Sequence, residues 1–155
     1  MTATATPTTL LEVTTQGSLV TGTEVAITSR QFSYTIDEPP ALGGTDKGAN
    51  PVEHLLAALA SCTVITYQVW ADKLGLAVDT IDVDLRGDLD LAGFLGTDDS
   101  VRPGFRGIEL GITVSGPESE ADYRRLEQAV AAHCPVLDNL TNGVPVTTTL
   151  EVAAA

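Results

Sequence analysis

The sequence predicts an α+β fold with antiparallel sheets around two main helices. Short segments in which apolar and polar residues alternate, as in strands, occur both before and after a long apolar helix. A second helical pattern, this one amphipathic, comes late in the chain. Runs of strands around separated helices favour an α+β fold over a regular alternation of strand and helix.

The bulk composition narrows the domain organisation and the partners. The chain has 155 residues, enough for one domain with a real core. We expect residues 1–9, rich in threonine and alanine, to be a flexible segment and residues 10–155 to form a single domain. Eight basic and 21 acidic residues give a net charge of −13, which disfavours binding to nucleic acid or to anionic membranes. The N-terminus lacks the pattern of a secretory signal, so we expect a cytoplasmic protein.

Three short strands are predicted before the first helix, at residues 10–15, 24–29 and 31–36. Gly17 and Gly22 mark turns, so the three segments should form an antiparallel meander, with Arg30 at the last junction. Residues 37–48 contain two prolines, three glycines and several acidic residues, a composition typical of a loop.

The longest apolar run, residues 50–74, predicts the central helix. Asn50 is a favourable N-cap, Pro51 fits the first helical position, and Gly75 follows where a left-handed residue often ends a helix. Apolar side chains cover nearly the whole circumference, which is typical of a buried helix, and we expect a second subunit to help cover it. Polar residues within the run and charges at its ends disfavour a membrane span.

The rest of the chain predicts two strands, a helix and a closing strand, at residues 78–85, 105–115, 118–133 and 144–152. A loop or loose hairpin at residues 89–103 joins the first two strands. Pro135 should end the helix, which leaves Cys134 at its carboxyl end.

The two cysteines, Cys62 and Cys134, are the main candidates for chemistry. In a reducing compartment they are core thiols, a catalytic pair or redox sensors, and the residues alone leave these readings open. In a catalytic pair Cys62 would be the better attacking thiol, because the helix dipole disfavours a thiolate at a helix carboxyl end. A cation, either Arg30 or Lys47 of the same or a second chain, would have to lower the pKa of Cys62.

The surroundings of Cys62 indicate the kind of substrate. Leu55, Ala58 and Ile65 share its face of the helix, so we expect the thiol to face an apolar pocket. A peroxide attacked there would leave a sulfenic acid, which a nearby thiol condenses to a disulfide. The sequence has neither zinc-ligand spacing nor a nucleotide-binding motif, so we expect no metal and no cofactor, and we assign no role to His54 or His133.

The chain resembles the OsmC/Ohr family of thiol-dependent peroxidases in the segments DEPPALGGTDKGANPVEHLLAALASC and HCPVLDNL, and in VRPGF between two strands. The likeness covers roughly residues 24–152. It implies an OsmC-like fold and an intertwined homodimer with the central helix buried. It also implies reduction of organic hydroperoxides to alcohols in oxidative-stress defence, with Cys62 as peroxidatic and Cys134 as resolving cysteine. A dithiol of the lipoyl type would be the reductant, and no prosthetic group would be bound.

The chain departs from the family pattern at two places. The family's peroxidases carry a glutamate ten residues before the helix cysteine, where this chain has Val52, and Glu53 comes one residue later. They also carry an activating arginine in an N-terminal strand or in the loop before the helix, for which Arg30 is the best substitute. Arg30 and Glu53 therefore join the two cysteines as candidate catalytic residues. The alternatives are a non-catalytic member that binds an apolar small molecule or senses oxidants, and a structural dimer with inert thiols.

Overall fold

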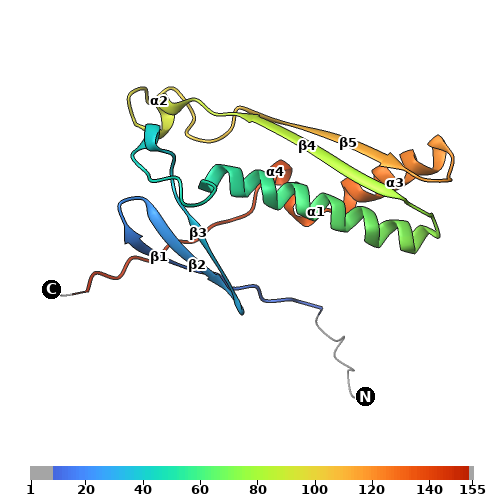
Figure 1. Ribbon diagram of the computed structural model, residues 1–155, viewed down its shortest axis with the longest axis horizontal. Helices are drawn as coiled ribbons and strands as arrows, with labels where there is room; N and C mark the ends of the chain where they lie inside the picture. The colour runs from blue at the N-terminus through green and yellow to red at the C-terminus, as the bar shows by residue number, and fades with distance from the viewer. Residues whose placement is uncertain (1–8, 154–155) are drawn as a thin grey trace, which may run out of the picture. The chain divides into compact units, whose positions relative to one another are not determined.

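The computed structural model describes residues 9–153, so most of the segment 1–9 lies outside the described residues. The chain forms two compact units, one ending at His54 and the other beginning at Leu55. The elements, shown in Figure 1, are the strands β1 (Gln16–Thr21), β2 (Glu24–Ser29), β3 (Phe32–Ile36), β4 (Thr80–Asp88) and β5 (Gly107–Ser115), the 3₁₀ helix η1 (Pro40–Leu42), and the helices α1 (Pro51–Leu74), α2 (Leu91–Phe94), α3 (Glu120–His133) and α4 (Pro135–Asn142). Both sheets are antiparallel, and the predicted α+β class is confirmed.

The first unit contains a three-stranded meander in the order β1-β2-β3. The prediction of β2 is confirmed to the residue, and Gly22 turns the chain with a φ of 54°. The first strand was placed too early, because Gly17 is not a turn residue. It pairs with Ile27 inside β1, where an added Cβ would lie 3.0 Å from the Ile27 Cδ1 atom. From the sequence alone, a strand glycine that makes room for a neighbouring side chain cannot be distinguished from a glycine in a turn.

The loop after β3 is organised by the carboxylate of Asp37, which is 1% exposed. It accepts hydrogen bonds from the Thr23 hydroxyl at 2.6 Å, from the Thr45 hydroxyl at 2.7 Å and from the Thr45 amide at 2.9 Å. The amides of Glu38 and Lys47 donate to it as well, at 2.9 and 3.3 Å. These donors, first among them the Thr23 and Thr45 hydroxyls, hold the pKa of Asp37 well below its ordinary value.

Helix α1 begins and ends where the sequence predicts. The Asn50 side chain accepts a hydrogen bond from the Glu53 amide at 2.9 Å, and the Glu53 carboxylate accepts one from the Asn50 amide at 2.8 Å. This reciprocal pair is a capping box, which satisfies two amides at the helix start. Gly75, with a φ of 68°, follows the last turn.

The core of the second unit lies on one side of α1. Tyr67 and Ala71 of α1 form a buried cluster with Leu126 and Val130 of α3, and side chains of β4 and β5 pack against it. Figure 1 shows α1 running along the β4–β5 hairpin. Burial of these apolar side chains supplies the main stabilisation of this unit.

The opposite side of α1 is largely uncovered. Five of its residues are buried, whereas Ile65 and Val69 are 63% and 44% exposed. By length and mean hydropathy, 1.3 over 18 residues, α1 also qualifies as a candidate membrane span, as core helices of soluble proteins can.

The C-terminal region departs from the prediction twice. Pro135 does end α3, but it also opens α4, since proline suits the first position of a helix. The predicted strand at 144–152 is absent, and its apolar residues, such as Leu150 at 86%, are exposed. Alternation favours a strand only where a partner strand can pair with it, and none does so within residues 9–153.

Candidate functional site

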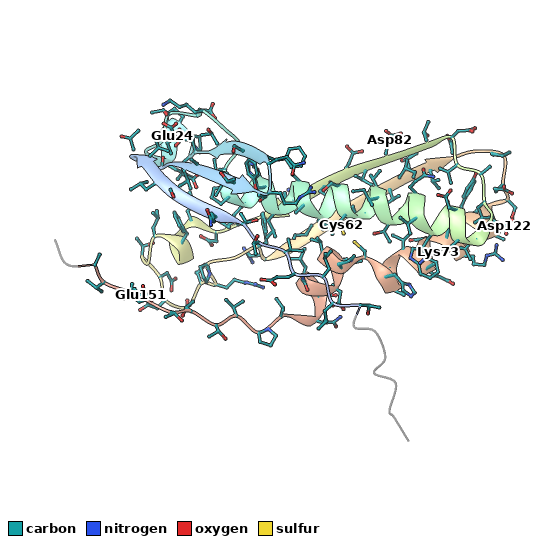
Figure 2. All side chains as sticks on the ribbon, turned by 90° about the horizontal axis from the view of Figure 1, so that it is seen from below. Glu24, Cys62, Lys73, Asp82, Asp122 and Glu151 are labelled. Atoms are coloured by element: carbon teal, nitrogen blue, oxygen red, sulfur yellow. The ribbon has the colours of Figure 1, made fainter. Side chains whose placement is uncertain are left out.

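The two cysteines come together although they are distant in the sequence. Cys62 lies midway along α1, and Cys134 lies at the junction of α3 and α4; both are free thiols, with their Sγ atoms 3.4 Å apart. Figure 2 shows Cys62 on the side of α1 that faces these two helices. A disulfide bond is about 2.05 Å long, so a small approach of the sulfurs would allow one to form.

The two thiols differ in their access to solvent. Cys134 is 1% exposed, whereas Cys62 is only partly buried. Of the two residues, Cys62 is therefore the more accessible to a molecule arriving from solvent. The buried Cys134 sulfur is placed to react with whatever forms on Cys62.

Cys134 is both the last cap of α3 and the N-cap of α4. Its predicted place at the carboxyl end of a helix is confirmed, whereas the helix that begins directly after it was not predicted. The positive end of the α4 dipole lies beside its sulfur and favours a thiolate. Burial raises the pKa of Cys134, but the Leu137 amide, the Cys62 thiol and the hydroxyls of Thr66 and Thr63 outweigh it, and the net pKa is lowered.

The pKa of Cys62 shifts in the opposite direction. Burial is the largest cause and raises the pKa, and the neighbouring Cys134 sulfur adds to the increase. The backbone amide of Val136, in the first turn of α4, partly offsets both effects. With only these neighbours the thiolate form of Cys62 is disfavoured, so attack by Cys62 calls for a further cation.

A groove is lined by residues of the same helices that carry the sulfur pair, although neither cysteine lines it. It has a volume of about 380 Å³ and is lined by Leu55, Leu59, Arg102, Gly104, Phe105, Arg106, Gly107, Ile108, Leu110, Leu137, Leu140 and Thr141. Leu59 lies one turn before Cys62 on α1, and the amide of Leu137 is the one that acts on Cys134. The groove is therefore built from the same turns of α1 and α4 as the sulfur site, and its walls are largely apolar.

Arg102 and Arg106 are functional candidates that the sequence argument missed. Both line the groove, and neither guanidinium makes an ion pair or hydrogen bond within residues 9–153. By contrast, Lys47 is held by Glu24 at 2.6 Å and Arg124 by Glu120 at 2.7 Å. In a chain of net charge −13, two arginines without an acidic partner indicate a functional site. Both occur in the segment VRPGFR, but the sequence does not show that they are unpaired.

Arg30 and Glu53 lie in the unit that ends at His54, whereas both cysteines lie in the unit that begins at Leu55. Arg30 occupies the β2–β3 turn with a φ of 56°, and its guanidinium lies 5.2 Å from the ring centre of Phe32. Glu53 caps α1 through Asn50. Their catalytic roles remain predictions.

Both histidines have local partners. His54 bonds through Nδ1 to the Asn50 carbonyl and stacks on Tyr34, with ring centres 5.4 Å apart. His133 bonds through Nδ1 to a backbone carbonyl of α3 and lies on Trp70, with ring centres 4.1 Å apart. Among residues 9–153, no three His, Cys, Asp or Glu side chains gather as metal ligands would.

Comparison with known proteins supports the resemblance seen in the sequence. The family model described as OsmC-like protein matches residues 44–149. A search of curated proteins found no significant match.

Solved structures share the fold. An OsmC-like protein from Mycoplasma pneumoniae is 23% identical, with a TM-score of 0.72 over 84% of this chain and 87% of that one. An organic hydroperoxide resistance protein OsmC from Legionella pneumophila is 15% identical, with a TM-score of 0.67 over 88% and 93%. An organic hydroperoxide resistance protein from Elizabethkingia anophelis is 15% identical, with a TM-score of 0.61 over 86% and 90%. At these identities the likeness establishes the fold alone.

Proposed function

This chain belongs to the OsmC-like protein family, and from that premise we propose that it is a thiol-dependent peroxidase that reduces organic hydroperoxides to alcohols. The observation that carries the proposal is the pair of free thiols with sulfurs 3.4 Å apart, one accessible and one buried. The names of the structural neighbours from Legionella pneumophila and Elizabethkingia anophelis, both organic hydroperoxide resistance proteins, agree with it.

The first step takes place at Cys62, because Cys62 is the more exposed of the two residues. The thiolate attacks one peroxide oxygen, so that an S–O bond forms as the O–O bond breaks. The alkoxide leaves, takes up a proton and departs as the alcohol, and Cys62 is oxidised to a sulfenic acid. The apolar groove suits the organic part of the substrate.

The second step takes place at Cys134. Its thiolate attacks the sulfenic sulfur of Cys62, a disulfide forms, and hydroxide leaves and is protonated to water. The lowered pKa of Cys134 favours this role, because it increases the fraction of the resolving sulfur that is ionised. An external dithiol of the lipoyl type then reduces the disulfide by thiol exchange and is itself oxidised.

Arg30 stays in this proposal as the cation that lowers the pKa of Cys62, and Glu53 as a residue that helps to orient it; both rest on the family resemblance. The need for such a cation is supported by the raised pKa of Cys62 among the neighbours described above.

We propose that the working form is a homodimer in the cytoplasm. Two features support a second subunit: the exposed apolar side of α1, with Ile65 and Val69, and the exposed alternating segment at 144–152. An apolar surface of this extent calls for a partner, and an unpaired strand pattern can complete a sheet of another chain. Light scattering should give twice the mass of one chain, and a monomer would contradict this part of the proposal.

Replacing Cys62 tests the peroxidase directly. The variant Cys62→Ser should lose turnover of a bulky alkyl hydroperoxide with a dithiol reductant, while its thermal unfolding stays close to that of the wild type. Undiminished turnover would end the proposal. If the wild type itself shows no turnover but binds a hydrophobic probe saturably, the chain is a non-catalytic binder.

A further inference from the structure

Two threonines of α1 lie beside the sulfur pair, and they differ in how their hydroxyls are satisfied. Thr63 is 1% exposed and Thr66 is 7% exposed. A buried helical threonine usually donates its proton to the carbonyl one turn earlier. Thr66 does so, to the Cys62 carbonyl at 2.7 Å. The Thr63 hydroxyl has no partner that meets hydrogen-bond geometry among the described residues.

An unpaired buried hydroxyl is unfavourable, so its position needs an explanation. Thr63 directly follows Cys62 in α1, the Cys62 sulfur lies 3.4 Å from that of Cys134, and the Thr63 hydroxyl is among the groups that lower the pKa of Cys134. The Thr66 hydroxyl lies near the same sulfur, but a hydroxyl has one proton, and that of Thr66 is committed to the Cys62 carbonyl. Of the two hydroxyls, only that of Thr63 has a free proton to offer.

We propose that Thr63 is a positioning residue, which donates its hydroxyl proton to the sulfur of Cys134 and holds it as a thiolate aimed at Cys62. The proposal does not need the peroxidase chemistry for its first part, the hydrogen bond to the thiolate. It rests on the proposed function for its second part, the attack on a Cys62 sulfenic acid. In that attack the sulfur–oxygen bond of Cys62 breaks, hydroxide leaves as water, and the Thr63 hydroxyl loses its charged acceptor.

The groups around Cys134 come from three elements. On α1 they are the Cys62 thiol and the two threonine hydroxyls, and on α4 the Leu137 amide. On α3 the preceding residue, His133, is turned to Trp70 and to a backbone carbonyl. Thr63 is thus the side chain that can add a donor to the sulfur without giving up another bond.

The test measures the pKa of Cys134 without any peroxide. In a Cys62→Ser background Cys134 is the sole thiol, and its ionisation can be followed by thiolate absorbance and by the pH dependence of alkylation. Adding Thr63→Val, which keeps the shape and removes the hydroxyl, should raise the pKa by about one unit, the effect of one hydrogen bond to a charged group. Thr63→Ser, which keeps a hydroxyl, should restore the lower value.

Thr66→Val is the matched control. It removes the same group one turn away on the same buried face, but the lost bond is to a backbone carbonyl. It should change the pKa of Cys134 by less than about a third of the Thr63→Val effect. Equal effects of the two variants, or no effect of Thr63→Val, would overturn the proposal. If Thr63→Val does not fold, the comparison of Thr63→Ala with Thr63→Ser decides in the same way.

A second measurement separates this inference from the proposed function. With Cys62 present, Thr63→Val should slow disulfide formation by up to about tenfold near neutral pH, since the thiolate fraction of Cys134 falls as its pKa rises, and more sulfenic acid should be trapped by dimedone. If no sulfenic acid forms even in the wild type, the peroxidase proposal fails. The pKa comparison then still decides the role of Thr63.

Discussion

Two buried polar clusters in this molecule are built in opposite ways. Both carboxylate oxygens of Asp37 have donors: two hydroxyls and three amides converge on them. Around Cys62 and Cys134 the polar groups are incompletely paired, with one thiol of raised pKa, one of lowered pKa and the Thr63 hydroxyl unbonded. A saturated cluster fixes a loop, whereas an unsaturated one keeps bonding capacity for a reaction.

The largest expected effect is a loss of catalytic turnover, and it concerns the cluster around Cys62 and Cys134. Cys134→Ser should lower turnover with a dithiol reductant by about two orders of magnitude, because the sulfenic acid on Cys62 is no longer resolved. Its thermal midpoint should move by only a few degrees. Peroxidase assays and dimedone trapping on Cys62 would check this. Full turnover without Cys134 would remove it from the reactive cluster.

The next effect is on stability and concerns the saturated cluster. Asp37→Asn replaces an acceptor that serves five donors by one that cannot, and should lower the thermal midpoint by on the order of 10 °C. Thiol ionisation in the folded protein should not change. Asp46→Asn removes the same charge from an exposed side chain of the same loop, and should leave the midpoint almost unchanged. Equal shifts would show that charge, and not burial, matters.

The contribution of the Asp37 carboxylate to the free energy of unfolding should depend on pH. The folded pKa of Asp37 lies below its ordinary value of 3.8, so the ionised form stabilises the fold above that pH. This contribution is lost as the pH falls below 3.8 towards the folded pKa. The stability difference between wild type and Asp37→Asn should therefore be constant near neutral pH and shrink in acid. Unfolding by denaturant at several pH values would measure it, and a difference that grows in acid would contradict the sign.

The smallest expected effect concerns Arg102 and Arg106, which line the groove, and tests whether they bind a charged part of the substrate. Arg102→Gln with Arg106→Gln should raise KM several-fold for a carboxylate-bearing hydroperoxide, since exposed charge pairs contribute about 0.2–1 kcal/mol each. A neutral hydroperoxide should be affected less. Arg86→Gln is the control, because Arg86 is exposed on β4 and bonded to Asp88. An equal loss for both substrates would exclude charge recognition by these arginines.

The elements predicted best from the sequence are those specified by local chemistry. The bounds of α1 follow from Asn50, Pro51 and Gly75, each of which acts within one turn of the helix. The strand β2 follows from its alternation alone. The OsmC-like resemblance is confirmed as family membership. It implied that Cys62 and Cys134 act together, and their sulfurs do lie 3.4 Å apart, while their reactivity stays a prediction.

The features that could not be predicted from the sequence depend on groups that are distant from one another in the chain. The donors to Asp37 come from three separate stretches, and no local pattern marks them. Thr63 follows Cys62 in the sequence, but its effect on the pKa of Cys134 depends on the fold, which brings Cys134 to this part of α1. Pro135 ends α3 as predicted, and it also begins α4, because proline suits both the position after a helix and the first position of one. The expected strand at 144–152 lacks a partner within the described chain.

The most direct measurement of the central claim is mass spectrometry of the reduced protein after one equivalent of an organic hydroperoxide. The account predicts that both thiols disappear together, that the chain loses two hydrogen atoms, and that a single cross-linked peptide joins Cys62 to Cys134. Two thiols that remain free and alkylatable after this treatment would contradict it.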